Sequence, residues 1–241
     1  MSNVSISTNN LSIGYGTAVI QRDLTFSLNA GEMVCMLGPN GCGKSTLLRT
    51  LAGLQPALSG EYTHGNAKNI ALVLTERLSM DNTTVHDVVA LGRYPYSSFL
   101  DGLKKEDEKI IEDSLRQVGF SNLEVSRTFF NAHSDGEKQR ILIAKALAQQ
   151  TPIILLDEPT AHLDLPHRIL ILRLLRNLAH EQGKTILIST HELDLALALS
   201  DRILLMTPGK GIQLDTAENL KKANAFTSAF SMDIFNPLGE K

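Results

Sequence analysis

The sequence is poor in the features that mark secreted, membrane-spanning or nucleic-acid-binding proteins. It has only two cysteines, Cys35 and Cys42, which are too few for a disulfide framework and not spaced as a metal-binding pair. Such isolated thiols suit a reducing cytoplasm. The net charge is -3, and charges of both signs are spread along the chain, so there is no basic field for a polyanion. We therefore expect no nucleic-acid partner.

Long apolar runs are also missing. A helix that crosses a membrane needs about 20 consecutive apolar residues. The strongest candidate, residues 169–178, is interrupted by Arg173, Arg176 and Asn177. The first residues have no basic start followed by an apolar run, so no signal peptide is expected. These absences predict a protein that is soluble when isolated.

The residues that are present fit an α/β protein. The chain has 241 residues, of which 43% are hydrophobic, and this is enough for a sizeable core. Residues 3–37 alternate apolar and polar positions and have turn residues at 9–10, 14–16 and 29–31, which predicts short antiparallel strands. Residues 33–37 form a continuous apolar run, typical of a central strand that is buried on both faces.

The rest of the chain alternates strands and helices. This alternation predicts a largely parallel sheet with ligands at the carboxyl ends of its strands. Residues 80–132 show helical spacing, and their densely charged stretch 104–113 is predicted to be a solvated helix face. We expect a single domain, residues 1–241, with a helical subdomain inserted at roughly residues 80–145. The expected strands are residues 69–74, 153–157, 184–189 and 202–206, and the expected helices are residues 44–52, 136–148, 166–180 and 192–199.

A glycine-rich segment joins the apolar run to the first expected helix. It reads G-P-N-G-C-G-K-S-T and matches the G-x-x-x-x-G-K-[ST] pattern of P-loop NTPases. Glycines let backbone N–H groups turn toward phosphate oxygens, Lys44 offsets phosphate charge, and the Ser45 hydroxyl can ligate Mg2+. A turn that merely caps a helix would need neither side chain. The predicted nucleotide-binding residues are Gly38, Pro39, Asn40, Gly41, Cys42, Gly43, Lys44, Ser45 and Thr46.

Two adjacent carboxylates, Asp157 and Glu158, follow the apolar strand 153–157. On a strand, neighbouring side chains point to opposite faces. We therefore expect Asp157 to hold the Mg2+ shell and Glu158 to act as general base on the water that attacks the γ-phosphate. Such a pair alone often marks only the start of a helix, but the phosphate loop favours catalysis.

These motifs resemble the nucleotide-binding subunits of ATP-binding cassette (ABC) transporters over nearly the whole chain. Ser134 and Gly136 occupy the family's signature motif, although His133, Asp135 and Glu137 depart from its usual form. The resemblance implies a RecA-like core, ATP and Mg2+ as cofactors, and a homodimer in the ATP-bound state. Two copies would enclose two ATP molecules head to tail, and each signature would meet the ATP of the opposite subunit. Ser134 with Glu137 also matches a capping box, and these residues can serve both as a helix cap and as part of the signature motif.

Further residues take roles from the same resemblance. Tyr15 matches the aromatic residue that stacks on adenine, and His191 matches the switch histidine that contacts the γ-phosphate. Asp164 lies in the loop that crosses the dimer interface, or it caps the following helix. Lys44, Glu158 and His191 are thus the expected catalytic residues. Thr75 stands where the family has a Gln metal ligand.

Residues 87–96 resemble a segment of importers of iron-siderophore complexes, haem and cobalamin. A helix that ends at Gly92 and Pro95 would also explain this segment. The resemblance implies an ATPase on the cytoplasmic face of the inner membrane, with two permease subunits and, indirectly, an extracytoplasmic substrate-binding protein. Arg93 and its neighbouring tyrosines are expected to contact the permease. The alternatives are a soluble assembly ATPase of the iron–sulfur cluster type, a scaffold that rarely hydrolyses ATP, and a transporter of another cargo.

Overall fold

A six-stranded sheet forms the centre of the protein in the computed structural model, which describes residues 4–64, 70–74, 80, 82–96 and 102–230. Its strand order is β5-β6-β7-β3-β8-β9, and neighbouring strands are parallel except for β8 and β9. Every residue of β3, β6 and β7 is buried, as their continuous apolar sequences predict. The strands are β3 (Met33–Leu37), β5 (Ile70–Val73), β6 (Ile153–Asp157), β7 (Thr185–Ser189), β8 (Arg202–Thr207) and β9 (Gly211–Asp215).

A separate three-stranded antiparallel sheet holds the start of the described chain. Its order is β2-β1-β4, with β1 at Val4–Tyr15, β2 at Ala18–Asn29 and β4 at Ser59–Thr63. The expected turn at residues 9–10 is wrong, because β1 runs through it as one strand. The register shifts between Thr8 and Leu11, and Asn10 has a φ of 48°. This β-bulge absorbs the turn-forming asparagine without ending the strand.

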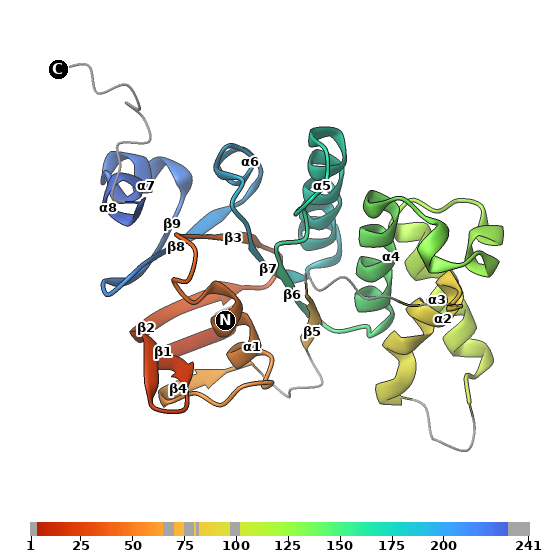
Figure 1. Cartoon of the computed structure of the whole chain (residues 1–241), viewed down its shortest axis with the longest axis horizontal. Coiled ribbons are helices and arrows are strands. Elements are labelled where there is room, and N and C mark those ends of the chain that lie inside the picture. The colour runs from red at the N-terminus through yellow and green to blue at the C-terminus, as the bar shows by residue number, and fades with distance from the viewer. Residues whose placement is uncertain (1–3, 65–69, 75–79, 81, 97–101, 231–241) are drawn as a thin grey trace.

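Two apolar cores cover the two faces of the central sheet. Met33, Cys35 and Leu37 of β3 belong to one core together with residues of α5, whereas Val34 and Met36 belong to the other with residues of α1. Figure 1 shows α1 between the two sheets and α5 and α6 on the opposite side. The helices outside the 80–148 region are α1 (Lys44–Leu51), α5 (Leu165–Gln182), α6 (Leu193–Leu199), α7 (Ala217–Lys222) and α8 (Ala225–Phe230).

The described residues between β5 and β6 are mostly helical and lie beside the β5 edge of the sheet (Figure 1). α4 contacts α2, α3 and β5, so this helix joins the helical region to the sheet. The predicted α/β fold with its mostly parallel sheet is confirmed. The elements of this region are α2 (Val85–Ala90), η2 (Leu91–Tyr96), α3 (Lys105–Gln117), η3 (Leu123–Arg127), η4 (Phe130–Ala132) and α4 (Asp135–Ala148).

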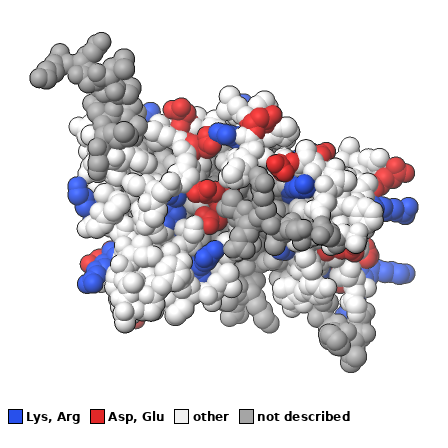
Figure 2. All heavy atoms as spheres, in the orientation of Figure 1, with Lys and Arg blue, Asp and Glu red and all other residues white. Residues whose placement is uncertain are grey.

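Charged side chains of both signs are interspersed on the face shown in Figure 2. The charged stretch 104–113 is mostly exposed, as predicted, but Asp107 within it is only 6% exposed. In the described part of the chain, no helix combines the length and the apolar character that membrane crossing requires.

Candidate functional site

The phosphate loop, residues 38–43, connects β3 to α1 at the carboxyl end of the sheet. Gly41 and Gly43 have φ values of 77° and 103°, which residues with side chains rarely adopt. A Cβ at Gly43 would lie 2.9 Å from Ile20 Cγ2, so the close packing also requires glycine. α1 has no side-chain cap and no acidic residue in its first turn. Its backbone N–H groups and its positive end are therefore available to an anion.

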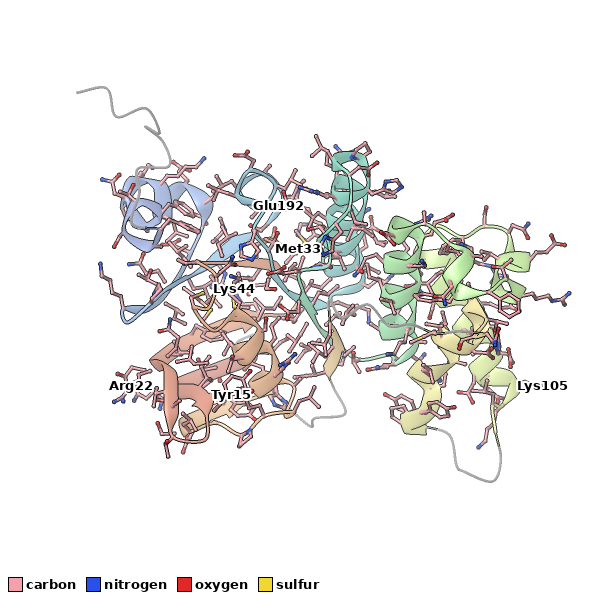
Figure 3. All side chains as sticks on the ribbon, viewed as in Figure 1. Tyr15, Arg22, Met33, Lys44, Lys105 and Glu192 are labelled. Carbon is pink, nitrogen blue, oxygen red and sulfur yellow. The ribbon has the colours of Figure 1, made fainter. Side chains whose placement is uncertain are left out.

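Lys44 is the first residue of α1 and is 6% exposed. Its Nζ donates hydrogen bonds to the backbone oxygens of Gly38 at 2.9 Å and of Pro39 at 3.2 Å. In the view of Figure 3, Lys44 lies in the middle of the molecule, between Tyr15 and Glu192. The lysine charge is thus held over the loop itself, where a chain of phosphates would need it.

A hollow lies at the mouth of the loop and brings predicted residues together. Gly38 and Cys42 are not among its described lining residues: a Cβ at Gly38 would meet Met206 O at 2.6 Å, and Cys42 is 3% exposed. Burial raises the pKa of the Cys42 thiol above its ordinary value, so the thiol stays neutral. The hollow is lined by Ile20, Asn40, Gly41, Gly43, Lys44, Ser45, Thr46 and Glu158.

The ends of β6 and β7 hold the predicted carboxylates in place. Asp157 is buried, and its Oδ1 accepts a hydrogen bond from Ser189 Oγ at 2.6 Å. The backbone N–H of Glu158 donates to Ser189 O at 3.1 Å and to Ser189 Oγ at 2.9 Å. His191 Nε2 lies 2.7 Å from Glu158 Oε1. The sequence analysis did not identify Ser189 as a site residue. In the sequence it is marked only by a hydroxyl group at the end of a buried apolar strand.

A change of backbone direction, and not strand alternation, separates the two carboxylates. β6 ends at Asp157, and Glu158 has a φ of 46°, in the left-handed region that non-glycine residues seldom occupy. Such conformations persist where the surroundings hold them, and they occur often at functional sites. This backbone turn directs Glu158 to the hollow while Asp157 stays buried beside Ser189.

Tyr15 is the last residue of β1, and its side chain is 51% exposed. Its hydroxyl oxygen accepts a hydrogen bond from Thr46 Oγ1 at 3.4 Å. The ring therefore lies near the start of α1 with accessible surface that a flat base could cover. This position is compatible with the predicted contact to adenine.

Ser134 and Gly136 lie at the start of α4. Ser134 is the N-cap, and the expected capping box is present, because Ser134 Oγ accepts from the Glu137 N–H and Glu137 Oε2 accepts from the Ser134 N–H at 3.1 Å. Ser134 Oγ also donates to Glu137 Oε2 at 3.0 Å. Hydrogen bonds from the Ser134 backbone and hydroxyl lower the pKa of Glu137, so it stays ionised near neutral pH. The serine hydroxyl is thus engaged by a carboxylate of its own helix.

Asp164 caps α5, since its side chain accepts from the His167 N–H at 3.1 Å. Ser134, Gly136 and Asp164 are not among the described residues that line the hollow. The predicted site residues thus form two groups, one around the phosphate loop and one at the starts of α4 and α5. Thr75, the predicted third metal ligand, lies outside the described residues.

The expected contact of Arg93 with a permease is wrong for the guanidinium group, because Arg93 is 6% exposed. Its Nε donates to Asp107 Oδ1 at 2.8 Å, and its Nη1 donates to Ala148 O at 2.8 Å. The group also lies over the Tyr96 ring, 4.4 Å from its centroid. Arg93 is therefore an internal link between η2, α3 and the end of α4. Tyr94 and Tyr96 remain accessible, at 68% and 47%.

Comparison with known proteins identifies the family. The family model described as ABC transporter matches residues 21–161, more than half of the chain, so the chain belongs to the ABC transporter family. The iron(3+)-hydroxamate import ATP-binding protein FhuC of Bacillus subtilis is 38% identical over 240 residues, which cover 95% of this chain and 88% of the relative. The chain is therefore an ATP-binding and ATP-hydrolysing subunit of this family.

Solved structures agree with this assignment. A metal-chelate type ABC transporter in an inward-facing conformation is similar with a TM-score of 0.87 at 30% identity, over 95% of this chain and 90% of that chain. A dimeric, post-hydrolysis ABC cassette bound to ADP and phosphate is similar with a TM-score of 0.74 at 25% identity, over 88% of this chain and 98% of that one. Dimeric assemblies thus occur among the structural relatives.

Proposed function

We propose that this chain binds ATP in the hollow and hydrolyses it to power the import of an iron chelate, such as a siderophore complex, through a separate membrane permease. The observation that carries the proposal is that Glu158 lines the hollow at the phosphate loop and that its carboxylate contacts His191. A carboxylate in that position can take a proton from a water molecule that the loop holds against the γ-phosphate.

The hydrolysis step follows from this arrangement. Glu158 accepts a proton from water, the water oxygen forms a bond to the γ-phosphorus, and the bond from that phosphorus to the β–γ bridging oxygen breaks. ADP leaves with the electron pair of that bond, and Lys44 with the α1 N-terminus offsets the charge on the departing phosphates. His191 contacts one oxygen of the Glu158 carboxylate and so orients the other toward the water.

Mg2+ fits the donor set at this end of the sheet. The Ser45 hydroxyl and the Asp157 carboxylate are oxygen donors of the kind that Mg2+ prefers, and phosphates and water would complete its shell. When bound, the ion would neutralise charge on the β- and γ-phosphates. Ser189 orients Asp157 for this contact through the 2.6 Å hydrogen bond. We also propose Thr75 as a ligand of Mg2+.

The residues at the starts of α4 and α5 could contact the ATP that is bound to another copy of the chain. We propose a homodimer in the ATP-bound state, in which Ser134, Gly136 and Asp164 of one subunit meet the nucleotide held by the phosphate loop of the other. Tyr15 would stack on adenine. We also propose that residues 1–241 form one ATPase domain, into which the helical region of roughly residues 80–145 is inserted.

The cargo is inferred from the relatives, one of which is named for iron(3+)-hydroxamate import and another for a metal chelate. In this proposal the subunit lies on the cytoplasmic face of the membrane and pairs with two permease subunits, and a substrate-binding protein delivers the chelate on the other side. Haem and cobalamin remain alternative cargoes of the same kind.

The test of the site is Glu158→Gln, which removes the base but keeps the shape of the side chain. We expect ATP binding to persist and hydrolysis to fall by about 10²–10⁴-fold, the usual contribution of a general base. Steady-state phosphate release and equilibrium binding of ATP measure the two effects. Glu181→Gln, an exposed glutamate of α5, is the control and should hydrolyse ATP at the parent rate. Undiminished hydrolysis in Glu158→Gln would refute the assignment of the base.

A further inference from the structure

The imidazole of His167, in the first turn of α5, lies between the two predicted interface elements. On one side, its Nδ1 pairs with the Asp164 carboxylate. On the other side, the ring lies against the backbone of α4 at Gly136. Figure 1 shows α4 and α5 standing side by side, at the boundary between the helical region and the sheet. One side chain therefore touches both the signature glycine and the loop that ends at Asp164.

The contact with Gly136 is close enough to explain why a glycine occurs there. A Cβ at this position would lie 2.5 Å from Cδ2 of His167, closer than real Cβ atoms approach other heavy atoms, and 3.0 Å from Cγ. Gly136 is the second residue of α4, so the His167 ring lies against the first turn of that helix. The glycine thus accommodates a ring from another helix, in addition to any contact with nucleotide.

The loop 161–164 is held from its other side as well. Arg168, the next residue of α5, donates from Nε to Leu163 O and from Nη1 to Glu192 Oε1, both at 2.6 Å. Glu192 is adjacent to His191, so this side of α5 is linked to the histidine that contacts Glu158. Hydrogen bonds from the His167 side chain and backbone lower the pKa of Asp164, which keeps the carboxylate ionised for its pairing with His167.

We propose that His167 is a positioning residue that fixes the start of α4 relative to the loop 161–164, so that both reach the ATP of the opposite subunit as one rigid surface. This inference rests on the proposed head-to-tail dimer. Removing the side chain should leave nucleotide binding by the subunit's own phosphate loop intact, because His167 is not among the described residues that line the hollow. It should weaken the step in which a second copy closes over that nucleotide.

The experiment uses the full chain with Glu158→Gln as the parent, because a subunit that binds but does not hydrolyse ATP should accumulate as a dimer. Sedimentation at a series of protein concentrations with ATP gives the dimer dissociation constant. A fluorescent ATP analogue at low protein concentration gives nucleotide affinity of the monomer. We expect His167→Ala to weaken the dimer by about tenfold, in the range of interaction free energies between coupled residues, with unchanged affinity for the analogue.

Two further variants separate the parts of the contact. His167→Asn keeps a donor close to the position of Nδ1 and should recover part of the dimer affinity. His167→Phe keeps a ring against Gly136 but loses the bond to Asp164, and should recover less. His180→Ala is the matched control, because His180 lies on the same helix and also pairs with a carboxylate, Asp201, at 2.9 Å. It should dimerise as the parent does.

The outcomes distinguish the inference from the proposed function. If the Glu158→Gln parent binds ATP but does not dimerise, the proposed dimer is wrong, and the proposed role of His167 is then wrong as well. If the parent dimerises and His167→Ala dimerises equally well, the inference alone is overturned. An equal loss of analogue binding and dimer affinity would also overturn it, since this would indicate general damage to the subunit. The Asn and Phe variants decide the question if the alanine variant does not fold.

Discussion

The N-termini of α1 and α4 are both proposed to contact ATP phosphates, but only the first turn of α4 contains acidic residues. α1 starts at the phosphate loop with no side-chain cap and no acidic residue in its first turn. α4 starts at Ser134 with a capping box, and Asp135 and Glu137 lie in its first turn. A carboxylate near a helix N-terminus is stabilised there, but it also offsets the positive potential that would attract a phosphate.

The difference fits two separate tasks. The α1 end, with Lys44, is built to bind nucleotide within one subunit. The α4 end has its serine hydroxyl engaged by Glu137, and it would add to binding only after a second copy arrives and this hydroxyl is redirected. We therefore expect a subunit that binds ATP by itself, closes with a partner at moderate affinity, and reopens readily once the γ-phosphate has left.

The two helices are also anchored differently. α1 follows the buried strand β3 through the phosphate loop, whereas α4 belongs to the helical region and is held at its C-terminal end by Arg93. Arg93→Ala should have the largest effect on stability, because it removes the guanidinium that pairs with the buried Asp107 and leaves that carboxylate with its hydrogen bond from the Lys104 N–H. We expect a loss of about 3–5 kcal/mol in the free energy of unfolding, measured in urea.

Arg116→Ala is the control for this prediction, since the pairs of Arg116 with Glu112 and Asp113 are about half exposed. Surface pairs of this kind contribute about 0–1 kcal/mol. If Arg93→Ala costs no more than Arg116→Ala, Arg93 does not anchor the helical region.

Lys44→Ala tests the α1 end. It removes the positive charge at the hollow, and we expect kcat/KM for ATP hydrolysis to fall by about 10²-fold or more. Lys184→Ala is the matched control, because Lys184 also donates to a backbone oxygen, Thr151 O at 2.9 Å, but precedes β7 at the amino end of the sheet. Equal rates in the two variants would mean that the α1 end is not the main phosphate site.

Glu137→Gln tests the α4 end and should have the smallest effect. The change removes a negative charge from the first turn while keeping groups that can bond to Ser134. We expect ATP-dependent dimerisation in the Glu158→Gln background to strengthen about two- to fivefold, as expected for one charge near a helix terminus. Glu106→Gln alters a first-turn glutamate of α3 and should change nothing. A weakened dimer would mean that Glu137 assists phosphate binding, which would reverse the comparison.

The sequence predicted the α1 end better than the α4 end because its chemistry is contiguous. The phosphate loop, Lys44 and Ser45 are neighbours in the chain, and a buried strand and a helix flank them in a recognisable pattern. The helix caps at Ser134 and Asp164 could also be predicted from the sequence, since a capping residue and its partner lie within three positions of each other.

Contacts between segments that are distant in the sequence could not be predicted in the same way. Arg93 looked like a surface residue of a permease-binding segment, but Asp107 and the end of α4 bury it. His167 gave no signal, because its contact with Gly136 exists only once two helices are packed. The strand β9 and the helices α7 and α8 were missed, since short elements are stabilised mainly by their tertiary neighbours.

We have proposed that this ATPase drives a membrane transporter for an iron chelate. The most direct test of this proposal is to purify the tagged chain from detergent-solubilised native membranes at low salt and to identify its stoichiometric companions by mass spectrometry. We expect a polytopic permease in equal copies, whose own sequence would narrow the cargo. Recovery with only soluble partners, as an assembly ATPase of the iron–sulfur type would give, would contradict it.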